Sequence, residues 1–157
     1  MLDQIRTKIV EMLRAIPEIG IVHERERYFS DLDKIRTTFI WQPPTAGSPK
    51  QVRGWFLRRV KMTSEHLGNY KYDLENTWEI TGYMSWNEEL NSEIVFDGLI
   101  EQISEVFQKP IALNQVQNAT KQGVVAHGIE LVDSSTVTFT GVVCHRATLQ
   151  LVTKHKS

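Results

Sequence analysis

Two stretches decide the fold, VRGWFLRRVKMT at residues 52–63 and TWEITGYMSW at residues 77–86. In the second stretch large or small apolar residues alternate strictly with mainly polar ones, which is the period of two of a strand with one buried face. The first stretch is rich in β-branched and aromatic residues, which favour strands. Gly68 and Asn69 lie between the two and can turn the chain. The sequence therefore predicts a long antiparallel β-hairpin.

Apolar residues with a helical period predict two long helices, over 3–16 and 92–108. Pro17 ends the first helix, and Lys109 with Pro110 ends the second. The apolar stripes consist of Ile5, Ile9, Met12, Leu13 and Ile16 in the first and of Phe96, Leu99, Ile100, Ile103 and Phe107 in the second. Ser92 is the expected N-cap of the second helix.

The remaining segments are shorter. We expect a strand over 21–29, a short helix over 31–38 and a loop over 41–51, which contains Pro43, Pro44 and Pro49. A polar stretch up to Gly123 precedes two or three final strands, which we expect over about 124–132, 135–143 and 144–153.

Consecutive strands without intervening helices imply antiparallel pairing. The predicted class is therefore α+β, with a mostly antiparallel sheet, a long β-hairpin and two main helices packed on one face. A length of 157 residues fits a single domain over 1–157.

Composition excludes several classes of protein. Hydrophobic residues make up 41% and charged residues 24% of the chain, which is not the composition of a disordered protein. A net charge of −1 disfavours a nucleic-acid binder. No apolar run is long enough to span a membrane, and the N-terminus lacks the apolar core of a signal peptide. The lone Cys144 fits a reducing compartment.

Charge is unevenly distributed along the chain. Between Lys71 and Lys109 there is no Lys or Arg, whereas nine carboxylates lie there: Asp73, Glu75, Glu79, Glu88, Glu89, Glu93, Asp97, Glu101 and Glu105. This pattern is typical of a solvated helix face and a polar strand edge. The alternative is an acidic surface that meets a basic surface on another subunit.

The sequence carries no motif for catalysis or for metal binding. No glycine-rich phosphate loop, CxxC or HExxH occurs, and the five histidines are scattered. Cys144 and His145 are neighbours on a predicted strand and should point to opposite faces, so we expect a buried, inert thiol. We therefore assign no catalytic, cofactor-binding or metal-binding residue and predict that the protein is not an enzyme.

The first strand of the hairpin is basic. It carries Arg53, Arg58, Arg59 and Lys61, and the return strand carries Asp73, Glu75 and Glu79. Pairing of opposite charges across the hairpin is one explanation. Stacking of nucleic-acid bases on the aromatic residues near these cations is another.

The order of segments resembles that of small tail-terminator proteins, also called tail-completion or minor tail proteins, of long-tailed bacteriophages and prophages. The resemblance covers most of residues 1–155. It rests on AIPEIG at 15–20, HERERY at 23–28, GWFLRR at 54–59, WEITGYM at 78–84, SE at 92–93, VF at 106–107 and ATLQL at 147–151.

This resemblance implies a structural subunit of a ring, typically a hexamer, that caps the tail tube. Such a ring ends tail polymerisation and provides the surface to which the head–tail connector docks. It needs no cofactor, and DNA only passes through it. The implied location is the virion tail and the bacterial host cytoplasm. The candidate residues for the subunit or tube interface are Arg25, Arg27, Arg53, Arg58, Arg59, Glu88 and Glu89.

Two further hypotheses stay open at this point. The chain is a small-molecule-binding or enzymatic α+β domain if it has a deep apolar pocket with convergent polar groups. It is a nucleic-acid-binding module if the basic hairpin retains DNA at low salt.

Overall fold

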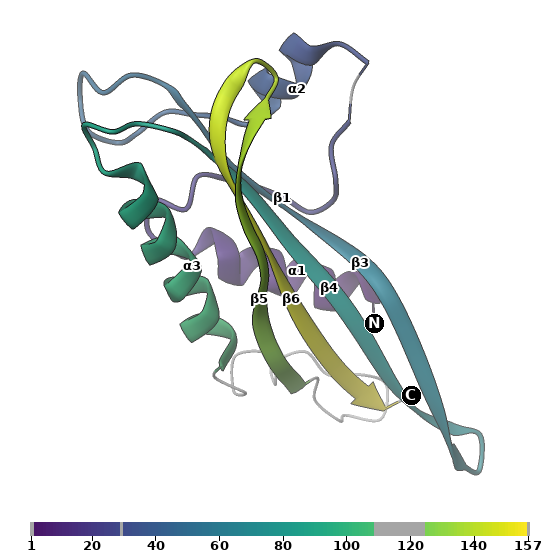
Figure 1. Ribbon diagram of the computed structural model, residues 1–157. Coiled ribbons are helices and arrows are strands. Elements are labelled where there is room, and N and C mark those ends of the chain that lie inside the picture. The colour runs from purple at the N-terminus through teal and green to yellow at the C-terminus, as the bar shows by residue number, and fades with distance from the viewer. Residues whose placement is uncertain (1, 29, 109–124, 157) are drawn as a thin grey trace.

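The computed structural model describes residues 2–28, 30–108 and 125–156, and in these residues a six-stranded mixed sheet carries three helices (Figure 1). The predicted polar stretch up to Gly123 lies outside the described residues. The helices are α1 (Leu2–Arg14), α2 (Leu32–Thr38) and α3 (Ser92–Gln108), and the strands are β1 (Ile21–His23), β2 (Ile40–Trp41), β3 (Gln51–Gly68), β4 (Lys71–Ser85), β5 (Val125–Phe139) and β6 (Val142–Lys156).

The hydrogen-bonded order of the sheet is β1-β3-β4-β6-β5, and β2 pairs with the start of β3. Four of the pairs are antiparallel, as predicted. The pair of β1 and β3 is parallel, with Ile21 opposite Gly54. The prediction of a mostly antiparallel sheet is therefore confirmed only in part. The segment with α2 and β2 lies between β1 and β3 in the chain and carries the backbone back to the end of the sheet where β1 begins. As a result β3 runs in the same direction as β1.

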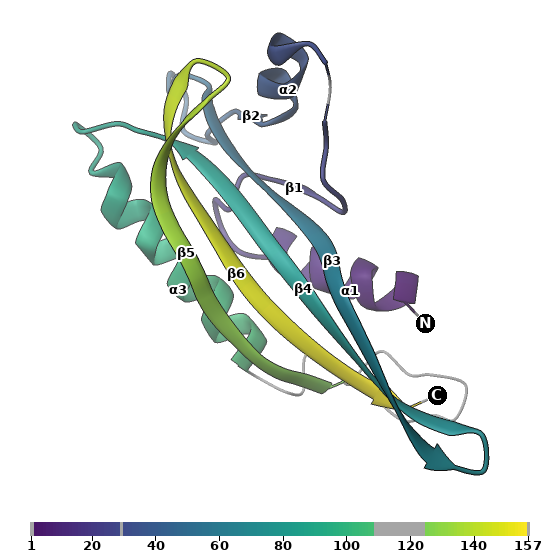
Figure 2. The same cartoon turned by 45° about the vertical axis from the view of Figure 1, so that its right-hand side comes forward.

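The main core lies between one face of the sheet and the two long helices, α1 and α3 (Figures 1 and 2). Its largest fully buried side chains include Trp55 and Trp78 from the sheet and Phe96 from α3. The indole N–H of Trp55 donates to the carbonyl oxygen of Ile19 at 3.0 Å, and that of Trp78 donates to Thr153 Oγ1 at 3.0 Å. Both buried indoles are therefore satisfied.

A second, smaller core lies on the other face of the sheet. Phe39, which caps the C-terminus of α2, is buried there against Phe56, Tyr83 and Phe139. The third helix, α2, is thus held at one end of this face, and the rest of the face is polar.

Three strand boundaries differ from the prediction. Of the described residues in the predicted strand 21–29, only Ile21–His23 form a strand. Most of the predicted strands 124–132 and 135–143 forms one strand, β5, which runs from Val125 to Phe139 with a register irregularity between Leu131 and Asp133. The turn comes instead at Thr140 and Gly141, which both have positive φ.

The hairpin of β3 and β4 is longer than predicted and projects. Its turn is formed by Asn69 and Tyr70, with φ of 53° and 60°, between the paired residues Gly68 and Lys71. Positive φ at both central residues makes this a type I′ turn. Residues 61–72, which we call the arm, are exposed except for half-buried Gly68, and they extend past the helix layer (Figures 1 and 2).

Candidate assembly surface

The basic residues predicted for an interface gather along one edge of the sheet. The Arg58 guanidinium lies 3.6 Å from the Glu26 carboxylate, so the segment with Arg25 and Arg27 runs beside β3. Arg25 and Arg58 are exposed and Arg27 is half-buried. Arg59 is exposed as well but is opposite Trp78, on the helix-covered face. We call this group of four arginines the basic edge.

Pairing across the hairpin does not account for Arg58. Its Cα lies opposite that of Glu79, as the charge pattern predicts. The Arg58 guanidinium, however, forms its ion pair with Glu26, outside the hairpin. Both members of that pair are more than half exposed, so it contributes at most about 1 kcal/mol and leaves Arg58 available to a partner.

Arg53 differs from the other arginines because it is buried, with 7% of its surface exposed. Its Nη1 donates to the carbonyl oxygen of Glu18 at 3.0 Å and its Nη2 to Gln51 Oε1 at 3.1 Å. The guanidinium lies 4.4 Å from the centre of the Trp41 ring. Burial lowers the pKa of Arg53, and its Nε has no hydrogen-bond partner in the structure. Arg53 is therefore not part of the basic edge.

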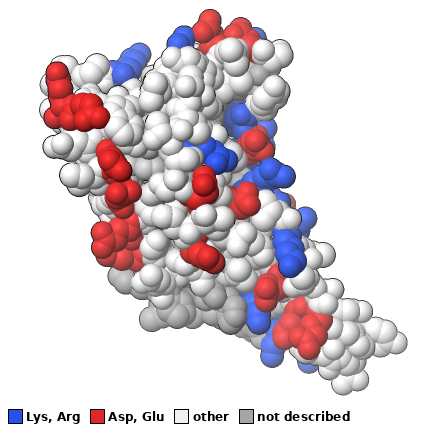
Figure 3. Space-filling model, viewed as in Figure 1, with Lys and Arg blue, Asp and Glu red and all other residues white. Residues whose placement is uncertain are grey.

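Helix α3 carries an acidic stripe on its exposed side. Glu93, Asp97, Glu101 and Glu105 follow one another at spacings of four residues, and all are exposed. The helix contains no Lys or Arg. Like charges four residues apart destabilise a helix, so the stripe lowers the stability of this element. In Figure 3 carboxylates without Lys or Arg lie over α3 at the left, and most of the Lys and Arg side chains lie toward the right, where β1 and β3 run and where carboxylates lie among them.

Glu88 and Glu89, the remaining predicted interface residues, lie in the loop that precedes α3, and both are exposed. Glu88 Oε1 accepts a hydrogen bond from the Trp86 indole at 2.7 Å. The two carboxylates extend the acidic stripe at the N-terminal end of α3. They do not lie with the arginines of the basic edge, so the predicted residues form two separate surfaces.

Ser92, the expected N-cap of α3, has a different role. Its hydroxyl lies 2.8 Å from His145 Nε2 and accepts a hydrogen bond from the Asn87 N–H at 2.8 Å. His145 stacks between Trp86 and Phe96, with ring centres 4.3 Å and 5.6 Å away. Burial lowers the pKa of His145, although Glu93, Asp97 and Glu88 act to raise it. The hydrogen bond to Ser92 and the stacking on Phe96 thus join His145 of β6 to α3.

Cys144 and His145 lie on opposite faces of β6, as predicted. Cys144 is fully buried in the smaller core beside Phe39 and Val52. Burial raises the pKa of its thiol to about 11, so the nucleophilic thiolate is scarce at neutral pH. Cys144 is a structural residue, and the prediction of a buried thiol is confirmed.

An open groove of about 710 Å³ lies between the proline-containing loop 42–50 and the start of α3. Trp41, Pro43 and Pro49 line one side, and Trp86, Leu90 and Val95 line the other; Arg53 also borders it. We call it the Trp41–Trp86 groove. The sequence pattern predicts Arg53 on a hairpin strand but does not predict this groove, because the walls of the groove come from segments far apart in the chain.

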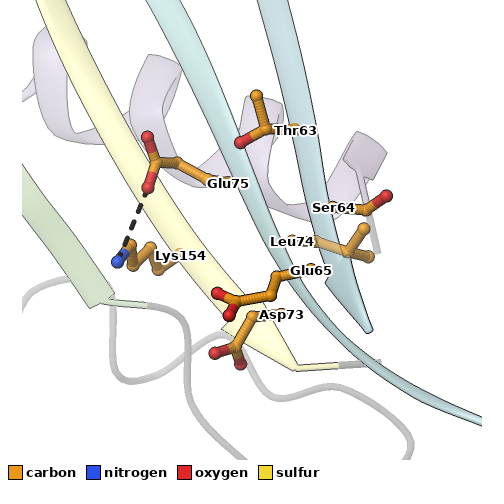
Figure 4. Close-up of a pocket in the computed structure, with 7 residues that line it drawn as sticks. All are labelled: Thr63, Ser64, Glu65, Asp73, Leu74, Glu75 and Lys154. Atoms are coloured by element: carbon orange, nitrogen blue, oxygen red, sulfur yellow. Dashed lines mark ion pairs between the residues drawn. The ribbon is translucent and has the colours of Figure 1, made fainter. Parts of the chain in front are cut away.

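The open polar face has a smaller hollow at the base of the arm (Figure 4). Lys154 forms an ion pair with Glu75 at 3.5 Å. Glu65 and Asp73 lie directly opposite each other on β3 and β4, and Figure 4 shows their carboxylates on the same side. Like charges opposite each other destabilise a sheet pair. On its other side, Asp73 lies opposite Lys156 of β6, a cation that offsets this repulsion.

Within the described ranges, no group of three or more His, Cys, Asp or Glu residues is arranged to hold a metal ion. No helix of that same part is long and apolar enough to cross a membrane. Comparison with known proteins gives no matching family model and no matching curated protein.

Proposed function

We propose that this protein is a structural subunit of a phage or prophage tail, which assembles into a ring that caps the tail tube. The ring ends tail polymerisation and offers the surface to which head–tail connector proteins dock. DNA passes through it without being bound as a substrate. The identification of the assembly as a tail ring rests on the resemblance in segment order. The charge distribution of the folded chain supports the head-to-tail contacts of such a ring.

We infer the self-assembly from two charged surfaces that lie on different sides of one copy. The basic edge follows β1 and β3, and the acidic stripe follows α3 (Figure 3). A contact between unlike surfaces leaves an unused acidic stripe on one copy and an unused basic edge on the other, so copies add head to tail. A ring forms where the rotation between copies closes. Complementary charge then fixes the register of each contact.

The first experiment is the absolute mass of the protein in solution, measured by light scattering on a size-exclusion column over a range of concentrations. We expect an equilibrium that moves toward about six subunits as concentration rises. A chain that stays monomeric and does not end the elongation of a polymerising tail tube, as seen by electron microscopy, would contradict the proposal.

A charge exchange tests the two surfaces directly. One variant reverses the basic edge with Arg58→Glu and Arg59→Glu, and the other reverses the stripe with Glu93→Lys and Asp97→Lys. Each alone presents two surfaces of the same sign and should not assemble. Mixed in equal amounts, they should assemble again, because the altered edge of one variant complements the altered stripe of the other. Assembly of either variant alone would exclude these surfaces.

The Trp41–Trp86 groove favours the alternative of a small-molecule-binding domain. Its volume falls within the range of ligand sites. It is open, however, and its lining includes the charged residues Glu18, Lys50 and Arg53.

A further inference from the structure

We propose that Tyr28 of one copy packs on an apolar patch at the start of α3 of the next copy. The patch consists of Trp86, Leu90, Ile94 and Val95. The inference rests on the self-assembly in the proposed function and names the apolar anchor within the contact between the basic edge and the acidic stripe. It does not depend on the identification of the assembly as a tail.

The patch exposes several large apolar side chains. Ile94 is 72% exposed and Leu90 58%, and Val95 and Trp86 are exposed as well. Trp86 joins the others, because it lines the Trp41–Trp86 groove with Leu90 and Val95 and also lines a smaller hollow that Ile94 borders. Apolar side chains that gather on a surface within a polar rim mark sites of protein contact. The patch is therefore a seat for an apolar group of a partner.

The rim of the patch is acidic on the side of Ile94. The smaller hollow is lined by Glu88 and Glu93 and by no Lys or Arg. Lys50 and Arg53 belong to the lining of the wider groove, which also contains Glu18. The apolar group that fits the Ile94 side is therefore one that cations surround.

Two histidines experience opposite local fields at the two surfaces. Burial lowers the pKa of His145, which stacks on Trp86, and three carboxylates at the start of α3 oppose this: Glu93, Asp97 and Glu88. Burial also lowers the pKa of His23, and three guanidiniums lower it further: Arg27, Arg14 and Arg25. The patch thus lies in a negative field, and the segment after β1 lies in a positive one.

Tyr28 is an apolar group of the required kind. It is 82% exposed and follows Arg25 and Arg27 of the basic edge in the chain. The isolated chain leaves its ring in water, whereas tyrosine is enriched among the residues that contribute most to protein interfaces. Its hydroxyl can also donate a hydrogen bond to a carboxylate of the rim.

The carboxylates near Tyr28 do not cancel the positive charge of the basic edge. The segment contains Glu24 and Glu26, and Glu26 is the ion-pair partner of Arg58. The four arginines of the basic edge outnumber these two carboxylates. Asp31 and Asp33, which follow, are engaged within the chain, since Asp31 caps α2 and Asp33 forms an ion pair inside that helix.

A second copy must supply the tyrosine, because the two features lie on different sides of the molecule. In Figures 1 and 2 the segment between β1 and α2 lies at the right, whereas the start of α3 lies at the upper left. Every copy carries both features, so the contact is head to tail.

Two substitutions separate the apolar anchor from the charge around it. Tyr28→Lys adds a cation to the basic edge, and Ile94→Asp adds a carboxylate to the acidic side. A contact based on charge alone would become tighter with either change. Loss of the apolar anchor should instead raise the dissociation constant of self-assembly by about tenfold or more.

Both side chains are mostly exposed, so the urea concentration at which the monomer unfolds should stay close to that of the wild type. Tyr70→Lys is the matched control, because Tyr70 is also exposed but lies at the tip of the arm. This control should leave the dissociation constant within about twofold of the wild-type value.

Disulfide trapping identifies the occupant of the patch. A Tyr28→Cys copy mixed with an Ile94→Cys copy should form a covalent dimer on mild oxidation, and buried Cys144 should not compete. A Tyr70→Cys copy mixed with the same Ile94→Cys copy is the control and should give at least about tenfold less dimer.

Three outcomes would overturn the inference. Assembly by Tyr28→Lys that is as tight as the wild type or tighter, with no trapped dimer above the control, would leave the charge contact of the proposed function standing without this anchor. Weakening by Ile94→Asp alone would mean that another residue occupies the patch. A wild-type chain that stays monomeric at every concentration would remove the contact, while electron microscopy would still decide whether the chain ends tail-tube elongation.

Discussion

At the scale of single residues, Gly82 shows how tightly the main core is packed. A Cβ at this position would lie 2.3 Å from a ring carbon of Trp55, a fully buried side chain. The Trp55 ring stacks on Phe96, with 5.5 Å between centres, and its N–H is held by Ile19. The ring therefore has little freedom to move away.

We predict that Gly82→Ala lowers the free energy of unfolding by about 1–3 kcal/mol through overpacking, measured by urea denaturation. Gly98→Ala on α3 is the matched control. A Cβ there meets nothing within 4 Å, so the change should stabilise the helix by up to about 1 kcal/mol. Equal effects of the two substitutions would contradict this account of the core.

The lowered pKa of His145 predicts that the stability of the protein depends on pH. Burial lowers its pKa below the usual 6.5, and His23 and His155 shift in the same direction, also mainly through burial. Below pH 6.5 the unfolded chain therefore binds protons that the folded chain does not. Stability should be complete above pH 6.5 and should fall as the pH decreases toward the folded pKa values.

The melting temperature, measured from pH 7.5 down to pH 5, tests this prediction. His145→Gln should lower stability at pH 7.5, where the contact with Ser92 is lost, and should also flatten the slope below pH 6.5. An unchanged slope would show that His145 does not contribute to the acid sensitivity.

At the scale of secondary-structure elements, α3 is the helix whose sequence opposes its own stability. Its acidic stripe places like charges four residues apart, and the helix contains no Lys or Arg to offset their repulsion. Asp97→Lys converts two repulsive spacings, to Glu93 and to Glu101, into attractive ones. The substitution should raise the free energy of unfolding by a few tenths of a kcal/mol up to about 1 kcal/mol and should weaken self-assembly.

Urea denaturation of the monomer and light scattering measure the two effects. Asp97→Asn removes the repulsion without adding attraction, so its stability should lie between those of the wild type and Asp97→Lys. A gain in stability without a loss of assembly would mean that the stripe is a solvated face only.

At the scale of the whole molecule, the separation of charge onto two sides predicts a salt-dependent assembly. Exposed charges are screened beyond roughly 10 Å at 0.1 M salt and beyond about 3 Å at 1 M. The dissociation constant should therefore rise steadily with sodium chloride, as measured by sedimentation at fixed protein concentration. Assembly that strengthens with salt would indicate that apolar contacts dominate instead.

The sequence by itself determined the elements whose pattern is local. The apolar stripes of α1 and α3 and the alternation through β4 are each complete within one segment, so α+β class, both long helices and the hairpin followed from them. The opposite orientations of Cys144 and His145 followed from strand geometry alone.

Only the tertiary structure decided which distant residues meet. It paired β1 in parallel with β3, buried Arg53 beside Trp41, placed Ser92 on His145 and joined the loop 42–50 to α3 around a groove. It also showed that the arm extends beyond the helices with Tyr70 at its tip. These contacts depend on how separate segments pack and on which buried polar groups find partners, and one residue pattern at a time does not contain that information.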